Sequence, residues 1–302
     1  MSLYTLNNQI LAIQVADQGA ELISIRNHKT GKEYLWNADP AYWKRHAPIL
    51  FPVVGSLKDK SYTYQGKNYS MLQHGFARDM KFTPGSRTGE ELWFYLEDTG
   101  DTRRVYPFRF RLELGYRLEG DTVTALWRVS NTGDSTMHFS IGGHPAFLLH
   151  PEKQAGDRAI PSQELCYFRF DTEKPLHYLL VDDNGLEVKK PFEEQHILNT
   201  ERSIYPIHPQ LFDHDALIIE DHQCHQVSLL DSSREAYLTV TFDAPLFGLW
   251  SPAGRNAPFV CIEPWYGRCD SGRFDGTLEE REYSNRLEPG EVFEASYRIK
   301  IH

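Results

Sequence analysis

Three short segments of this 302-residue chain concentrate histidine, glycine and proline between stretches of regularly alternating residues. The segments are Gln73–Arg78 (QHGFAR), Gly142–Phe147 (GGHPAF) and Ile262–Gly267 (IEPWYG). His74, His144 and Glu263 are the residues in them whose side chains commonly act as general acids and bases. We interpret this set as the parts needed for proton transfer to and from a neutral substrate. Each histidine alone is more typical of a turn in which the imidazole only satisfies hydrogen bonds.

Glu263 directly follows an apolar run, Ala257–Ile262, which predicts a buried strand. A carboxylate at the end of such a strand is either paired for structural reasons or held with a raised pKa that suits acid–base chemistry. The residues themselves leave both interpretations open.

Signatures of several other enzyme classes are absent from the sequence. There is no Gly-x-Ser-x-Gly nucleophile motif, no phosphate-binding loop and no dinucleotide-binding GxGxxG. His222, Cys224 and His225 are metal-ligand residue types, and Cys261 and Cys269 could add sulfur, but their spacing fits no usual zinc pattern. We therefore expect solvated histidines in a polar loop between strands, no metal site and no cofactor.

The elements that must position these residues are predicted to be strands. Apolar and polar residues alternate over Phe108–Leu118 and again over Val123–Val129, with the turn residues Glu119–Asp121 between them. This pattern predicts an antiparallel hairpin. The same alternation recurs in Leu92–Leu96, Leu238–Phe242 and Phe293–Ile301. Helical periodicity of any length and a recognisable linker are both missing, so we expect an all-β chain that forms one large antiparallel domain over residues 1–302.

Composition narrows the range of partners. The 42 acidic residues outnumber the 32 basic ones, giving a net charge of −10 that disfavours binding to nucleic acids or anionic lipid. No apolar stretch approaches the roughly 20 residues of a membrane span, and no signal peptide is recognisable. The four cysteines form no CxxC pair, so we expect a cytoplasmic protein with reduced thiols. Aromatic residues make up 13% of the chain, which suits both β-structure and a sugar-binding cleft.

The three segments, read together with their surroundings, resemble the galactose mutarotase (aldose 1-epimerase) superfamily and within it the LacX-like branch. The resemblance covers nearly the whole chain. It is carried by Arg45–Gly55 (RHAPILFPVVG), Tyr69, His74–Arg78 (HGFAR), Gly143–Phe147 (GHPAF), Gly248–Trp250 (GLW) and Cys261–Gly267 (CIEPWYG). Each motif is modestly specific, but their occurrence in this order is strong evidence.

The resemblance implies a β-supersandwich of large antiparallel sheets with the site in a central cleft. It also implies a role for each candidate residue. Glu263 matches the family's general base at the anomeric hydroxyl, and His144 matches the general acid at the ring oxygen. His74 matches a second histidine near that oxygen, and Arg45 matches an arginine that contacts the substrate.

The carboxylate that holds the distal sugar hydroxyls has two candidates in the segment Phe212–Leu217. Asp215 is the better match, with Asp213 as its competitor because the motif is short. Relatives that act on hexose 6-phosphates tend to carry an arginine just before the HGFAR histidine, where this chain has Gln73.

The resemblance therefore predicts a cofactor-independent aldose 1-epimerase whose partner is a small sugar such as galactose or another free aldohexose. Three alternatives remain. They are a hexose-6-phosphate mutarotase, a non-catalytic sugar-binding protein of the same fold, and a glycoside hydrolase or lyase that would use Glu263 with Asp213 or Asp215 as its two carboxylates. The sequence does not fix the oligomeric state.

Overall fold

Strands dominate the structure, as the alternating sequence predicts. The computed structural model describes residues 1–150 and 162–302, with 46% strand and 9% helix. Its one α-helix within those ranges, α1 (Gly100–Val105), is six residues long. None of the helices in the described part of the chain has the length and apolar character needed to cross a membrane.

Two large antiparallel sheets organise the chain. In spatial order, the nine-stranded sheet contains β17 (Ile204–Pro206), β14 (Tyr167–Phe170), β19 (Gln226–Leu230), β20 (Ala236–Phe242), β24 (Val292–Ile301), β10 (Thr122–Asn131), β9 (Phe110–Glu119), β8 (Glu91–Glu97) and β7 (Thr83–Arg87). The six-stranded sheet contains β18 (Leu217–Ile219), β21 (Leu246–Trp250), β22 (Phe259–Tyr266), β12 (Ile141–Gly143) and β4 (Ile49–Leu50), with β13 (Ala146–Leu148) also paired to β22.

Smaller elements complete the fold. The small sheets are β1–β2–β3 (Leu3–Asn7, Leu11–Ala16, Leu22–Asn27), β5–β6 (Ser61–Tyr64, Lys67–Ser70), β11–β23 (Met137–Phe139, Asn285–Leu287) and β15–β16 (Leu176–Tyr178, His196–Leu198). The 3-10 helices are η1 (Lys58–Lys60), η2 (Ala77–Asp79), η3 (Ser162–Leu165), η4 (Phe192–Glu194), η5 (Pro209–Phe212) and η6 (Leu278–Glu280).

The predicted strands are present, with two corrections at their ends. The hairpin is β9–β10, but β9 begins at Phe110 because the N–H of Phe108 donates to the carbonyl of Tyr106 and is turned away from the ladder. The run predicted from Ala257 becomes strand only at Phe259. It then continues as β22 through Glu263 to Tyr266, so this carboxylate lies inside a strand rather than at its end.

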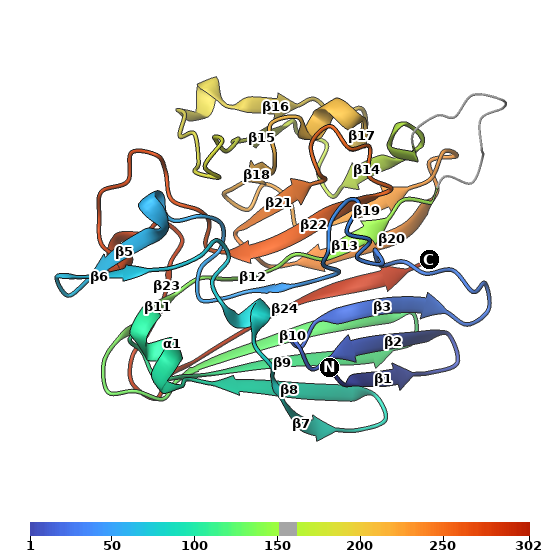
Figure 1. Cartoon of the computed structure of the whole chain (residues 1–302). Coiled ribbons are helices and arrows are strands. Elements are labelled where there is room, and N and C mark those ends of the chain that lie inside the picture. The colour runs from blue at the N-terminus through green and yellow to red at the C-terminus, as the bar shows by residue number, and fades with distance from the viewer. Residues whose placement is uncertain (151–161) are drawn as a thin grey trace.

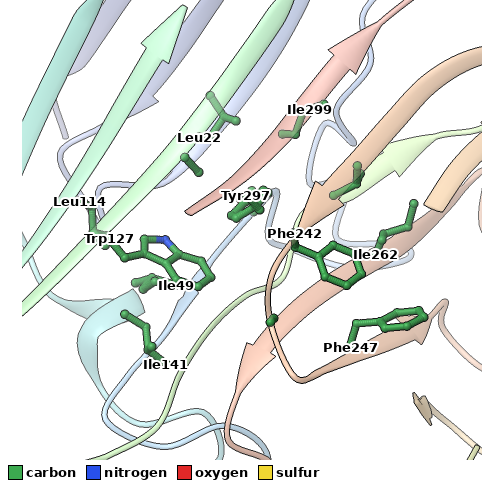
Figure 2. Close-up of a cluster of buried hydrophobic side chains, with 14 of the residues drawn as sticks. Leu22, Ile49, Leu114, Trp127, Ile141, Phe242, Phe247, Ile262, Tyr297 and Ile299 are labelled. Atoms are coloured by element: carbon green, nitrogen blue, oxygen red, sulfur yellow. The ribbon is translucent and has the colours of Figure 1, made fainter. Parts of the chain in front are cut away.

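The main core lies between the two large sheets, which Figure 1 shows as stacked layers with the six-stranded sheet largely in orange. Figure 2 shows side chains from both sheets meeting there. From the nine-stranded sheet come Leu114, Trp127, Phe242, Tyr297 and Ile299, and from the six-stranded sheet come Ile49, Ile141, Phe247 and Ile262. These side chains are buried, and their removal from water stabilises the sandwich by about 25 cal/mol per Å² of apolar surface.

The same alternation decides which residues face away from this core. Ile262 points into it, so its neighbours Cys261 and Glu263 point to the opposite face of the six-stranded sheet. All three residues are at least 99% buried. The opposite face is therefore also covered by other parts of the chain, and it is there that the candidate site lies.

Candidate active site

A cavity of about 220 Å³ lies over this second face of the six-stranded sheet. Strand register explains how two of the candidate residues meet at it. Ala146 of β13 pairs with Cys261 of β22 in an antiparallel ladder, which places His144 opposite Glu263 two residues further along. The His144 Nε2 and Glu263 Oε2 atoms are 3.3 Å apart. Both side chains line the cavity.

His74 reaches the same cavity from the turn after β6. Its φ is +65° and that of Gly75 is +70°, so two consecutive residues adopt left-handed backbone. A Cβ on Gly75 would lie 2.2 Å from the Phe51 carbonyl oxygen, and glycine is therefore required at this position. The Gly55 N–H donates to His74 Nδ1 at 3.1 Å, which leaves the Nε2–H of the neutral ring free to donate to a ligand.

Aromatic rings hold the His144 imidazole in place. Trp43 stacks on it with ring centroids 4.7 Å apart and an angle of 26° between the planes. Trp250 and His74 contact it edge-on at 5.4 and 5.7 Å. The buried Nδ1 atom of His144 has no hydrogen-bond partner among the described residues, so packing rather than a hydrogen bond to this nitrogen orients the ring.

Burial favours the uncharged forms of all three groups. It is the main cause of a Glu263 pKa far above its ordinary value, and the nearby Asp215 carboxylate adds to that rise. Burial also lowers the pKa of His144 to about 3, and it lowers the pKa of His74 well below its ordinary value. The positive charge of Arg78 acts on both histidines in the same direction. Glu263 and His144 together therefore hold one exchangeable proton across a short contact.

The two candidate aspartates are separated by the structure. Asp215 lines the cavity, whereas Asp213 ends helix η5 and does not. Arg45 lies beside the cavity but is not among the residues that line it, and its guanidinium donates to Asp79 at 2.9 Å. Its predicted contact with a substrate stays a prediction.

Other residues line the cavity that the sequence did not single out as site residues. Arg78 belongs to the HGFAR motif and donates to the backbone carbonyl of Gln73 at 2.7 Å. Gly185 belongs to an irregular segment with no recognisable signal, yet its backbone lies against Ser56. Trp43 lines the cavity as well, and no local pattern marks it.

The metal-ligand residue types fall into two groups. His222, Cys224 and His225 occupy the loop between β18 and β19, and the Cys224 thiol donates to the backbone carbonyl of Gln226. In the described ranges, only His144, Cys261 and Glu263 bring three possible ligand atoms within 4.8 Å of one another. No spacing in the sequence connects these three residues as a ligand set, because His144 is distant from the other two along the chain.

Comparisons with known proteins agree with this architecture. A family model described as aldose 1-epimerase matches residues 2–300. The chromosomal protein LacX of Lactococcus lactis is 31% identical over 307 residues, which cover 98% of each chain. The solved structure of a galactose mutarotase related enzyme from Lactobacillus acidophilus is 35% identical, with a TM-score of 0.90 over 100% of this chain and 97% of that one. A galactose mutarotase-like protein from Lactobacillus casei is 25% identical, with a TM-score of 0.89 over 100% of both chains.

Proposed function

The chain belongs to the aldose 1-epimerase family, as its motifs indicated, and we propose that it interconverts the α and β anomers of a free aldohexose. The observation that carries the proposal is the 3.3 Å contact between His144 Nε2 and Glu263 Oε2 in the wall of a cavity. A base and an acid that share one proton are what a cyclic hemiacetal needs in order to open and close.

In the proposed reaction the Glu263 carboxylate accepts the proton of the anomeric hydroxyl. The bond between C1 and the ring oxygen breaks, and the ring oxygen takes a proton from the His144 imidazolium. Rotation about the C1–C2 bond turns the aldehyde, and the same steps in reverse close the ring on its other face. The pair holds one proton before and after opening, so no cofactor is required.

The resting pair reaches the reactive state by an internal proton transfer. Its favoured form in the empty cavity has a protonated Glu263 and a neutral His144, because burial disfavours both charges. Transfer of that proton across the contact gives a carboxylate base and an imidazolium acid without exchange with solvent. His74, with its free Nε2–H, donates to the ring oxygen and steadies it during the transfer.

The remaining lining residues suit a neutral monosaccharide. Trp43 and Trp250 offer flat apolar faces to the C–H side of a pyranose, and Asp215 accepts hydrogen bonds from distal hydroxyls. Gln73 lines the cavity as an uncharged donor and acceptor where an arginine would favour a phosphate.

A hexose-6-phosphate mutarotase is the second candidate, and one observation favours it. Arg78 lines the cavity, and its pKa, lowered to about 10 mainly by burial, keeps the guanidinium charged at neutral pH. A cation at this position forms an ion pair with a phosphate group, which the uncharged Gln73 side chain does not.

Polarimetry tests the proposal directly. Freshly dissolved α-glucose and α-galactose should reach anomeric equilibrium faster with the protein than without it, and their 6-phosphates should respond less. Glu263→Gln protein, purified in the same way, controls for mutarotase carried over from the expression host. If neither free sugar equilibrates faster with the native protein than with this variant, the proposal is wrong, and a response by the 6-phosphates alone supports the second candidate.

A further inference from the structure

We propose that the same cavity binds a zinc ion through His144, Cys261 and Glu263, and that this ion switches the enzyme off. The binding half of the inference stands on the geometry of the three side chains. The inhibitory half rests on the proposed function, because it assumes that His144 and Glu263 carry the reaction.

The three ligand atoms are already arranged for a small metal ion. They lie within 4.8 Å of one another, and the His144 Nε2 to Glu263 Oε2 distance is 3.3 Å. Bonds of about 2.0–2.3 Å in a tetrahedral zinc site place neighbouring ligand atoms about 3.5 Å apart. The histidine and glutamate therefore need little rearrangement, and the Cys261 sulfur must approach by at most about 1 Å.

Rigid elements hold the ligands on one face. Cys261 and Glu263 are alternate residues of β22, and His144 precedes the strand β13 that pairs with it. The cavity in front of His144 and Glu263 gives an ion a path to the site and leaves room for a water molecule as the fourth ligand. The site thus has three protein ligands and an open position, as in many accessible zinc sites.

The donors are also free to bind. The buried Oε2 atom of Glu263 forms no hydrogen bond with the described residues beyond its 3.3 Å contact with His144 Nε2, which is itself a proposed ligand atom, and Cys261 forms no disulfide. A thiolate and a carboxylate would together neutralise the two charges of Zn²⁺, which suits a site from which water is largely excluded. The mixed sulfur, nitrogen and oxygen set favours zinc over magnesium or calcium, which prefer oxygen ligands alone.

Binding and catalysis are mutually exclusive at this site. Zinc would engage the Nε2 atom of His144 and the carboxylate of Glu263, the two groups that exchange protons in the proposed reaction. We therefore expect zinc to inhibit rather than to assist, and a chelator to restore activity.

Cobalt(II), a spectroscopic substitute for zinc, tests the binding half without any sugar. Titration of the native protein should give a thiolate-to-cobalt charge-transfer band that saturates at one ion per chain and disappears when zinc is added. Cys261→Ser should lose the band and bind zinc at least about 10-fold more weakly. Cys269→Ser is the matched control, because Cys269 is buried like Cys261 and lines the cavity, but it is not among the three ligands. It should keep the band.

Absence of the band in the native protein, or a band that survives in Cys261→Ser, overturns the inference. Should Cys261→Ser fail to fold, Glu263→Gln provides the second test, since it should also weaken cobalt binding at least about 10-fold. Polarimetry then tests inhibition through the ratio of the mutarotation rate without zinc to the rate with zinc. Zinc should slow the native protein at least about 10-fold and should slow Cys261→Ser only a little. A protein that binds cobalt as described but never accelerates mutarotation refutes the proposed function and the inhibitory half, and leaves the metal site standing.

Discussion

Glu263 and His144 combine two opposite pKa shifts in a single contact. Burial raises the pKa of the carboxyl group and lowers that of the imidazole to about 3. Neither group alone is suited to acid–base catalysis near neutral pH, since the Glu263 carboxyl group stays protonated and the His144 imidazole stays neutral. As a pair they hold one proton that can occupy either group, and the unit of function is the pair.

We expect Glu263→Gln and His144→Asn each to lower kcat roughly 100-fold or more while sugar binding persists. Glutamine cannot accept the anomeric proton, and asparagine cannot deliver one to the ring oxygen. The double variant should be little slower than either single variant, because groups that act as one unit are not additive. Polarimetric kcat and calorimetric sugar binding measure both effects. Variants that only melt earlier and keep native kcat would point to a structural role.

Trp43 is expected to act through His144. Its indole stacks on the imidazole, and its backbone carbonyl accepts a hydrogen bond from the Trp36 indole at 2.7 Å. Trp43→Leu should lower kcat on the order of 10-fold and shift the pH profile of kcat, because the imidazole loses its fixed plane. Trp43→Phe should restore most of the rate.

Tyr42→Leu is the control for Trp43. Tyr42 packs edge-on against Trp36 at 5.6 Å but does not line the cavity. Its loss should lower the melting temperature without moving the pH profile. An unchanged pH profile in Trp43→Leu contradicts the positioning role.

Short motifs and the family resemblance predicted four of the lining residues, and only the fold identifies Trp43 and Gly185. His74, His144 and Glu263 stand in segments whose glycines and prolines are recognisable locally. The choice of Asp215 over Asp213 for the cavity wall depends on how the chain leaves η5. Trp43 contacts His144, which lies about one hundred residues further along the chain, and no local sequence pattern predicts such a contact.

At the scale of elements, the alternation of apolar and polar residues predicted where strands form, but it did not predict which strands pair with each other. The β9–β10 hairpin follows from two adjacent runs and the turn between them. The pairing of β13 with β22, which brings His144 to Glu263, joins segments more than one hundred residues apart. Many strands of similar pattern could pair in many orders, and burial on both faces of the six-stranded sheet removes the polar alternation that would orient β22.

The turn that presents His74 should be intolerant of any side chain at Gly75. Gly75→Ala combines a φ of +70° with a Cβ 2.2 Å from the Phe51 carbonyl oxygen, so we expect a loss of more than about 3 kcal/mol in the free energy of unfolding. Gly120→Ala is the matched control, because its φ is +57° and its Cβ would meet nothing within 4 Å. It should lose only about 1 kcal/mol. Urea unfolding measures both values, and equal losses would contradict the steric argument.

At the scale of the whole molecule, the negative net charge is expected to favour free sugars over sugar phosphates as substrates. The net charge of −10 repels a phosphate dianion at long range, and the uncharged Gln73 adds no second cation beside Arg78 in the cavity. We expect kcat/KM to be higher for free glucose or galactose than for the 6-phosphates, and added salt to narrow the difference by screening. Gln73→Arg should raise kcat/KM for the 6-phosphates. A higher native value for either 6-phosphate overturns this expectation.

The free energy of unfolding should also depend on pH, because buried acidic and basic groups change their pKa on folding. His74 has a folded pKa far below its unfolded value of about 6.5, so the unfolded chain binds a proton there that the folded chain does not. Its contribution to the free energy of unfolding therefore rises with pH up to about 6.5. The Glu263–His144 pair behaves differently. Folded and unfolded chains both hold one proton on these two groups between about pH 4.5 and 6.5, and above that range only the folded chain keeps it.

These opposite dependences predict greatest stability near pH 6.5. Below this pH His74 lowers the free energy of unfolding by up to about 1.4 kcal/mol per pH unit, and above it the retained proton on the pair lowers stability again. Glu220, whose pKa burial raises to about 7, lowers stability between about pH 4.5 and 7 and therefore offsets part of the rise on the acid side. Urea unfolding at intervals from pH 5 to 8 measures the curve. His74→Asn should make the acid side shallower without removing its slope, because burial also lowers the pKa of His138, His150, His196 and His302. Glu263→Gln, which cannot ionise, should make the alkaline side shallower. A native curve that rises steadily to pH 8 would show that the pair releases its proton in the folded chain, and the shared-proton mechanism would lose its basis.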